Sequence, residues 1–286
     1  MTSISPTFDA TSASALEAKA KTANSSYWRK VYFWRVAILV LSLGAWELTA
    51  RYEIIDPFRY SMPSQIWARL VEWITEGTSE GPLWYHLYIT MEESILGFVS
   101  GSVIGVVAGI ALGRNKMAAD IFALYIQLIN SIPRVVLAPI FTVIFGLGLM
   151  SKVALSFVMV FFVVFANAFQ GVREADKAMI ANARILGASE SQLTRSVIIP
   201  SALSWIFASL HVSFGFAIIG AIVGEFVGAR YGIGLLISIA KGSFDSAGMF
   251  AAILIVMVVA LIAEYLMTYI ENRFSAWKPP VSQDVA

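Results

Sequence analysis

The sequence predicts an all-α integral membrane protein with about six transmembrane helices. Of its 286 residues, 58% are apolar and only 14% are charged, whereas about 25% of the residues of an ordinary soluble domain are charged. Long apolar runs recur along the whole chain, and each reaches the roughly 20 residues that cross a hydrocarbon core about 30 Å thick. A single buried soluble core would not require runs of this length.

Composition also excludes several functions. The formal net charge of +1 gives no sign of the basic face of a nucleic-acid-binding protein. Cysteine is absent, which excludes disulfides, thiolate metal sites and cysteine nucleophiles. The two histidines, His86 and His211, lie far apart in the sequence, so we expect no histidine metal cluster. We therefore expect no catalytic residue, no metal site and no nucleic-acid partner in this chain.

The apolar runs divide the chain into segments. We expect spans at residues 33–51, 90–112, 118–146 (interrupted), 152–172, 202–227 and 249–270. The first run is too long for the apolar region of a cleaved signal peptide, so it is expected to remain as an anchor. The expected segments are a disordered cytoplasmic tail (1–30), a first helix with a periplasmic loop (31–85), a transmembrane domain (86–270) and a cytoplasmic C-terminal tail (271–286).

The distribution of Lys and Arg predicts the orientation of the chain. Six spans place both termini on the same side of the membrane. If that side is the inside, the inside segments hold about twice as many Lys and Arg residues as the outside segments, in agreement with the positive-inside rule. We therefore expect a multi-pass protein with both termini in the cytoplasm.

The third apolar region contains two prolines and an arginine. Pro133 and Pro139 should break or kink this helix, because proline removes a backbone donor and clashes with the preceding turn. Irregular backbone at membrane depth requires cover from protein or a water-filled cavity, so Pro133, Arg134 and Pro139 are candidate pathway residues. A simple packing kink is the alternative. Arg134 could attract an anion through bidentate hydrogen bonds, or it could pair with a carbonyl or an acid near the break.

Acidic residues also occur within or beside the apolar runs. Glu225, near the outer end of the fifth span, should face a cavity or reach water. It is a candidate pathway residue, and interfacial anchoring is the alternative. Glu92 and Glu93, at the start of the second span, are expected at the outer interface.

Two spans carry glycine at every fourth position. These glycines are Gly97, Gly101, Gly105, Gly109 and Gly113 in the second span, and Gly220, Gly224, Gly228 and Gly232 in the fifth. Small residues at this spacing let helix backbones approach closely in a lipid environment. The pattern predicts tight helix packing, and it leaves open whether the packing lies within one chain or across a dimer.

The longest inside connection, residues 171–200, predicts a short helix, a turn and a second helix. Residues 176–186 are rich in good helix formers, and Gly187 stands where a helix would end. Ser189 and Gln192 fit a capping box that begins the next helix, which leads through Pro200 into the fifth span. A compact helix with small exposed residues is suited to dock into another protein.

The residues of this connection resemble a known family. Ala181–Ala188, followed by Ile198–Pro200, resembles the "EAA" loop of permease subunits in bacterial ABC importers. Residues 132–152 and Gly224–Gly234 are similar to the branch that imports sulfonates, taurine, nitrate and related small anions. The resemblance covers about residues 60 to 272 and implies the type I ABC importer permease fold, in the bacterial inner membrane.

The resemblance implies a coupling segment at residues 173–200 that docks on an ATPase. The docking residues that it implies are Ala181, Asn182, Ala183, Arg184, Leu186, Gly187, Ala188 and Pro200. Ala181 stands where the family has an acidic residue, and Glu174 or Asp176 could take over its role. The implied partners are a second permease chain, forming a homodimer, two ATP-binding subunits and a periplasmic solute-binding protein. The chain contains no GxxxxGK[ST] loop, so ATP and Mg are expected on the ATPase.

Two other function classes remain as alternatives. A secondary transporter or channel driven by an ion gradient would need intramembrane carboxylates or unwound helices in matching halves of the chain, and no convincing internal repeat is present. A membrane-embedded enzyme is disfavoured by the lack of cysteine, of paired histidines and of a hydrolase motif.

Overall fold

The computed structural model describes residues 10–274, which form helices joined by short connections. The chain divides into two compact units between Gln65 and Ile66. The first unit contains α1 (Ala10–Arg51) and α2 (Pro57–Tyr60), and α3 (Pro63–Thr75) begins in it. Of the expected tails (1–30 and 271–286), residues 1–9 and 275–286 lie outside the described residues, and residues 271–274 continue α12.

Helix α1 begins earlier than the sequence analysis expected. Residues 10–30 were assigned to a disordered tail, and in the structure they continue the helix of the first span. The reason is local, because this segment is rich in alanine and contains no proline or glycine, which favours a helix. The part from Tyr27 to Arg51 is long and apolar enough to cross a membrane.

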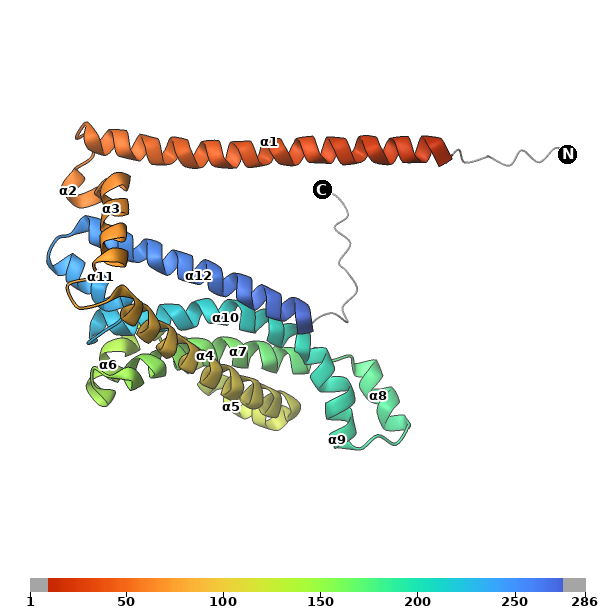
Figure 1. Cartoon of the computed structure of the whole chain (residues 1–286). Coiled ribbons are helices and arrows are strands. Elements are labelled where there is room, and N and C mark those ends of the chain that lie inside the picture. The colour runs from red at the N-terminus through yellow and green to blue at the C-terminus, as the bar shows by residue number, and fades with distance from the viewer. Residues whose placement is uncertain (1–9, 275–286) are drawn as a thin grey trace. The chain divides into compact units, whose positions relative to one another are not determined.

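The second unit is a helical bundle (Figure 1). Its further elements are α4 (Leu83–Arg114), α5 (Lys116–Asn130), the 3₁₀-helix η1 (Arg134–Val136), α6 (Leu137–Phe145), α7 (Leu149–Arg173), α8 (Lys177–Ile185), α9 (Glu190–Leu193), the π-helix η2 (Thr194–Ile198), α10 (Ile199–Val227), α11 (Ile233–Gly242) and α12 (Ser246–Phe274).

By length and composition, five helical segments of the described chain can cross a membrane, and a bent pair gives a sixth span. The bent pair consists of Lys116–Asn130 and Arg134–Phe145, which meet at an angle of 70°. The prediction of about six spans is therefore confirmed. The second span begins at Leu83, seven residues before its expected start at residue 90, so residues that were expected in a loop lie inside a helix.

The bend in the third region lies at Pro133. This residue has an extended backbone conformation immediately before η1, so the chain leaves α5 and restarts in a new direction. Pro139 lies in the first turn of α6, where backbone N–H groups have no acceptor within the helix and a missing donor costs little. Of the two prolines, Pro133 marks the break and Pro139 is accommodated without one.

Helix α7 is the centre of the bundle, and all five glycines of α4 and two of the glycines of α10 pack against it. Each of the five α4 glycines lies against an α7 residue, in the order Ser156, Val160, Val164, Ala168 and Val172. From α10, Gly220 lies against Ser156 and Gly224 against Lys152, whereas Gly232 lies beyond the end of α10 and against Glu225. The packing that the glycines predict is therefore found within one chain, with α7 held between α4 and α10.

The fit along these contacts leaves no room for larger side chains. A methyl group at Gly109 would lie 2.7 Å from the Cβ atom of Ala168, and one at Gly220 would lie 2.6 Å from the Cα atom of Ser156. Such distances are shorter than van der Waals contact, so the helix backbones are as close as glycine permits. Gly228, at the end of α10, lies against Leu147.

The bundle has two ends that differ in their elements. Helices α4 and α7 run parallel, because each step of four residues along one matches a step of four along the other. The end where they finish carries α8 and α9, and we call it the α8 end (Figure 1). The opposite end carries α11, and we call it the α11 end.

Candidate functional site

The helix-turn-helix that the sequence predicts is present at the α8 end. The carboxylate of Asp176 accepts hydrogen bonds from the N–H groups of Ala178 (2.7 Å) and Met179 (3.4 Å) at the start of α8. Gly187 has a φ of +84°, a conformation that glycine adopts without strain. The N–H of Ala188 donates to the carbonyl of Ala183 at 3.0 Å, which closes the end of the helix.

The turn after Gly187 leads directly into α9. The hydroxyl of Ser189 accepts from the N–H of Gln192 (3.3 Å), and the Gln192 side chain accepts from the N–H of Ser189 (2.8 Å). Both halves of the predicted capping box are therefore formed. The side chain of Arg184 pairs with Glu190 across the turn at 3.1 Å, which ties α8 to α9.

The surface of α8 exposes apolar side chains. Ile185 is 83% exposed and Leu186 is 86% exposed, and Met179 is also exposed. Among the other expected docking residues, Ala181, Asn182, Arg184 and Gly187 are exposed, and Ala183 and Ala188 are half-buried. Large exposed apolar side chains at the end of an otherwise polar helix are typical of a surface that is covered by another protein.

The two acids that could replace the acidic residue missing at Ala181 are already engaged. Asp176 caps α8, as described above, and Glu174 accepts a hydrogen bond of 2.7 Å from the side chain of Gln170. The exposed methyl group of Ala181 therefore offers no charge at this point of the surface.

Pro200 lies where α10 begins, and the helix before it is irregular. Residues Thr194–Ile198 form a π-helix, in which the N–H of Ile199 bonds to the carbonyl of Thr194. Proline has no N–H to continue the α-helical pattern, and π-helical turns are frequent at functional sites. Residues 190–227 nevertheless form one continuous helical segment, so α9 is joined rigidly to the membrane helix α10.

A second group of polar residues is buried at the α11 end. His86, Thr90 and Glu93 come from α4, Lys152 comes from α7 and Glu225 comes from α10. We call these five residues the buried polar cluster, and each is at most 3% exposed. Ionisable groups are costly in such surroundings unless they are paired or hydrogen-bonded.

Three members of the cluster hold the start of α11. The N–H of Gly232 donates to Nδ1 of His86 (3.0 Å), the N–H of Ile233 to the hydroxyl of Thr90 (2.9 Å), and the N–H of Gly234 to the carboxylate of Glu225 (2.7 Å). The first N–H groups of a helix have no acceptors within it. Here three consecutive groups are satisfied by side chains from α4 and α10. Helix α11 is therefore fixed to both membrane helices.

The positions of Glu225 and Glu93 differ from those that the sequence suggested. Glu225 is 0% exposed, so it is not an interfacial anchor. Its carboxylate accepts hydrogen bonds from the hydroxyl of Thr90 and the N–H of Gly234. Glu93 was expected at the outer interface and is only 2% exposed. The reason is that α4 begins at Leu83, which places Glu93 about three turns inside the helix.

The third charge of the cluster belongs to Lys152, which begins the expected fourth span at residues 152–172. Its side chain is fully buried in the first turn of α7. The ammonium donates to the carbonyls of Leu147 (2.7 Å) and Gly148 (3.2 Å) and interacts electrostatically with Glu93 and Glu225. Sequence reasoning found Glu225, because it is an acid within an apolar run, and missed its partners Thr90 and Lys152.

Arg134 has partners that differ from those expected. Its guanidinium donates a 3.0 Å hydrogen bond to the side-chain oxygen of Asn130 and lies 5.3 Å from the ring centre of Phe162. It is half-buried at the bend between α5 and η1. The side chain is thus held by an amide and an aromatic face, and it keeps donors that no described acid neutralises.

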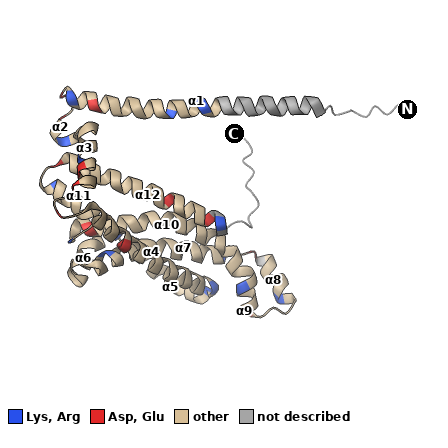
Figure 2. Ribbon diagram, in the orientation of Figure 1, with Lys and Arg blue, Asp and Glu red and all other residues tan. Residues whose placement is uncertain are grey.

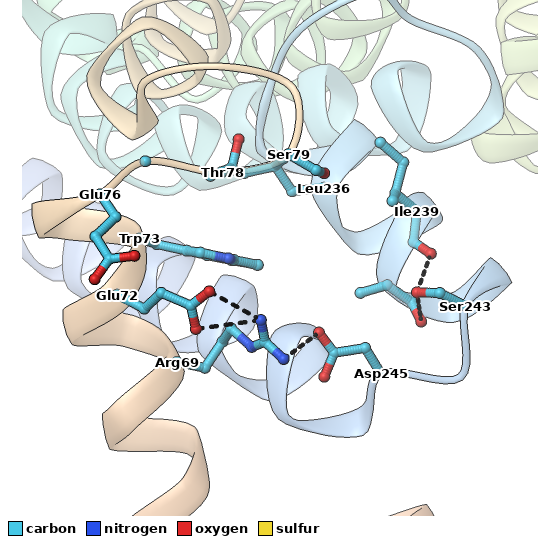
Figure 3. A pocket seen from close by; sticks show the side chains of 12 residues that line it. Arg69, Glu72, Trp73, Glu76, Thr78, Ser79, Leu236, Ile239, Ser243 and Asp245 are labelled. Atoms are coloured by element: carbon cyan, nitrogen blue, oxygen red, sulfur yellow. Dashed lines mark hydrogen bonds and ion pairs between the residues drawn. The ribbon is translucent and has the colours of Figure 1, made fainter.

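A polar pocket of about 450 Å³ lies between α3 and α11 (Figure 3). Arg69 forms ion pairs with Glu72 and Asp245, both at 3.3 Å. Figure 3 shows the Trp73 ring extending alongside these charged groups. Since Asp245 also caps α12 through the N–H of Gly248 (2.9 Å), the pocket ties α3 to the start of α12. It lies at the same end as the buried polar cluster, because α11 lines the pocket and its first N–H groups bond to the cluster.

Comparisons with known proteins agree with these features. Residues 101–276 match the family described as "binding-protein-dependent transport system inner membrane component". The chain is similar to a putative aliphatic sulfonates transport permease protein of Bacillus subtilis, at 28% identity over 87% of this chain and 90% of the relative. It is 26% identical to a taurine transport system permease protein of Escherichia coli, over 85% and 88% of the two chains.

A relative with another substrate has comparable similarity. The riboflavin transport system permease protein of Chloroflexus aurantiacus is 30% identical over 84% of this chain and 88% of the relative. Among solved structures, a chain of the MetNI methionine ABC transporter in an inward-facing conformation is similar, with a TM-score of 0.54 and 20% identity over 67% of this chain and 93% of the other. It shares the fold. Since the family match covers more than half of the sequence, this chain belongs to the inner membrane components of binding-protein-dependent transport systems, the permease subunits of ABC importers.

Proposed function

We propose that this permease subunit carries a small anionic solute, a sulfonate, taurine, nitrate or a related organic acid, across the bacterial inner membrane. The observation that carries the coupling part of this proposal is the exposed apolar tip of α8, formed by Ile185 and Leu186. This tip docks into an ATP-binding subunit, which binds ATP and Mg. Closure of the ATPase on nucleotide moves α8 and, through the continuous segment 190–227, the membrane helix α10.

The proposed assembly contains two copies of this chain, two ATP-binding subunits and a periplasmic solute-binding protein. Both termini and α8 lie on the cytoplasmic side. Support for this orientation comes from Arg114, Lys116, Arg173, Arg184, Arg195 and Arg273, which lie at the α8 end. Figure 2 shows basic residues at this end of α5, α8, α9 and α12. Basic residues are retained on the cytoplasmic side of inner-membrane proteins.

Anionic substrates are favoured by Arg134 and by two of the relatives. The donors of Arg134 that Asn130 does not occupy suit the oxygens of a sulfonate or carboxylate. The aliphatic sulfonate and taurine permeases point to the same class. The riboflavin relative makes a larger aromatic solute the competing candidate.

The experiment is reconstitution of this chain with its ATP-binding and solute-binding partners in proteoliposomes. ATP turnover is measured with the binding protein loaded in turn with taurine, an aliphatic sulfonate, nitrate or riboflavin. We expect turnover to rise with one of the small anions, together with uptake of that anion. Stimulation by riboflavin alone would overturn the proposed substrate class, and turnover that does not depend on the binding protein would overturn the assembly.

A further inference from the structure

A second pocket, of about 770 Å³, lies at the α8 end. It is formed where the turn between α4 and α5 faces the end of α7, α8, α9 and η2. The residues that matter for its chemistry are Arg114, Lys116, Arg184, Glu190, Val172 and Leu193. None of them belongs to the buried polar cluster or to the pocket beside Arg69.

The rim of this pocket carries excess positive charge. Three cations, Arg114, Lys116 and Arg184, face one acid, Glu190. Glu190 is already paired with Arg184 at 3.1 Å, and neither Arg114 nor Lys116 forms an ion pair with any residue whose side chain the structure describes. The rim is therefore complementary to an anionic group.

The floor of the pocket is apolar. Val172 and Leu193 are buried there, 6% and 1% exposed, and Ala111 and Ile198 also line it. The pocket lies where the candidate membrane spans α4 and α7 end, which is the level of lipid headgroups. A ligand that fills both parts has an anionic head and an apolar body, as an anionic phospholipid has.

Helix α8 presents different side chains to this pocket and to its exposed tip. Ile180 and Arg184, one turn apart, line the pocket. Ile185 and Leu186 do not line it and are almost fully exposed. A ligand in the pocket thus contacts α8 at Ile180 and at Arg184, one of the expected docking residues, and leaves the tip formed by Ile185 and Leu186 uncovered.

We infer that this pocket binds the headgroup phosphate of an anionic phospholipid, which holds α8 against the turn between α4 and α5. The inference rests on the proposed function insofar as α8 is the element that contacts the ATPase. The bound lipid would stiffen the connection through which ATPase closure reaches the membrane helices.

The test uses the complete transporter in lipid nanodiscs made of phosphatidylcholine with a small fraction of phosphatidylglycerol. Phosphatidylglycerol retained per permease after delipidation is counted by native mass spectrometry. Arg114→Gln/Lys116→Gln should retain it about thirtyfold more weakly, because each basic residue near a lipid surface strengthens binding several-fold. The matched control is Arg195→Gln/Arg273→Gln, which removes two exposed cations of the same end that do not line the pocket.

A further variant and a competing anion distinguish lipid binding in the pocket from nonspecific attraction of lipid to the basic residues of this end. Ala111→Trp keeps every cation, fills the pocket and should also lose the lipid. Inorganic phosphate at millimolar concentration should not displace phosphatidylglycerol. Equal retention in both double variants, retention by Ala111→Trp, or displacement by phosphate would each overturn the inference. ATPase co-purification from the same samples reports on the proposed function separately, because loss of the ATPase in the wild type with the lipid retained would count against that function alone.

Discussion

The carboxylate of Glu225 accepts a hydrogen bond of 2.7 Å from the hydroxyl of Thr90, which joins α10 to α4 at the buried α11 end. The two residues are 135 positions apart in the sequence. The same carboxylate also accepts from the N–H of Gly234 at the start of α11. One side chain therefore connects three helices of the permease.

The first prediction concerns Glu225. Glu225→Ala leaves the Gly234 N–H buried without an acceptor and the Thr90 hydroxyl with only the His86 carbonyl at 3.1 Å, which should cost about 3 kcal/mol of stability. We expect a clear fall in the thermal unfolding temperature of the detergent-solubilised protein. Glu225→Gln keeps one acceptor oxygen, so its unfolding temperature should fall less. Equal falls in the unfolding temperature of the two variants would show that the Thr90 and Gly234 hydrogen bonds are not the cause.

The second prediction concerns the single cation of the buried polar cluster. Lys152→Met removes the charge that faces Glu93 and Glu225, so two buried carboxyls lose their counter-ion and the protein should be strongly destabilised. Adding Glu93→Gln to Lys152→Met should recover part of the loss, because it leaves one buried carboxyl in place of two. Additive effects of the two substitutions in a double-mutant cycle would contradict this coupling.

The third prediction concerns the glycine ladder of α4. Gly109→Ala places a methyl group against Ala168 of α7 and should cost about 1 to 3 kcal/mol, because the two backbones must separate. The matched control is Gly215→Ala in α10, which has no neighbouring atom within 4 Å and should be neutral or slightly stabilising. Thermal unfolding of both variants checks the contrast, and similar losses at the two positions would argue against close packing on α7.

The fourth prediction concerns Arg134. If the guanidinium attracts an anionic solute, Arg134→Gln should lower the rate of uptake in proteoliposomes while the yield of assembled transporter stays near that of the wild type. Asn130→Ala is the control, because it removes the 3.0 Å hydrogen bond to Arg134 and leaves the charge in place. A parallel loss of assembled protein in Arg134→Gln would show that the residue supports the bend between α5 and η1.

Local sequence patterns predicted the spans and the helix-turn-helix around Gly187. Apolar run length and capping residues determine structure within a few helical turns, so a local pattern is sufficient to recognise them. These patterns did not predict which helix packs against the glycines of α4. The partner surface on α7 consists of small and β-branched residues at the same spacing of four, Ser156, Val160, Val164, Ala168 and Val172. Recognising this second row of residues would have identified α7 as the helix that packs against the α4 glycines.

Local sequence patterns could not predict the buried polar cluster, and the cause is physical. Its members come from three helices and meet only after the helices pack, so no spacing in the sequence records their contact. The one usable signal was ionisable residues inside apolar runs. It identified Glu225, but the late expected start of α4 placed Glu93 at the interface. Lys152 begins the expected fourth span, and nothing in its local sequence indicates that its ammonium is buried beside Glu93 and Glu225.

The central claim is that the tip of α8 contacts an ATP-binding subunit on the cytoplasmic side of the membrane. The chain has no cysteine, so Leu186→Cys introduces a single thiol at this tip, and Ser64→Cys serves as the control on the segment expected in the periplasm. In intact cells, a membrane-impermeant maleimide should label Ser64→Cys and leave Leu186→Cys unlabelled, and a short bifunctional reagent should cross-link Leu186→Cys to the ATPase. Labelling of Leu186→Cys from outside, or its failure to cross-link in an active complex, would contradict the claim.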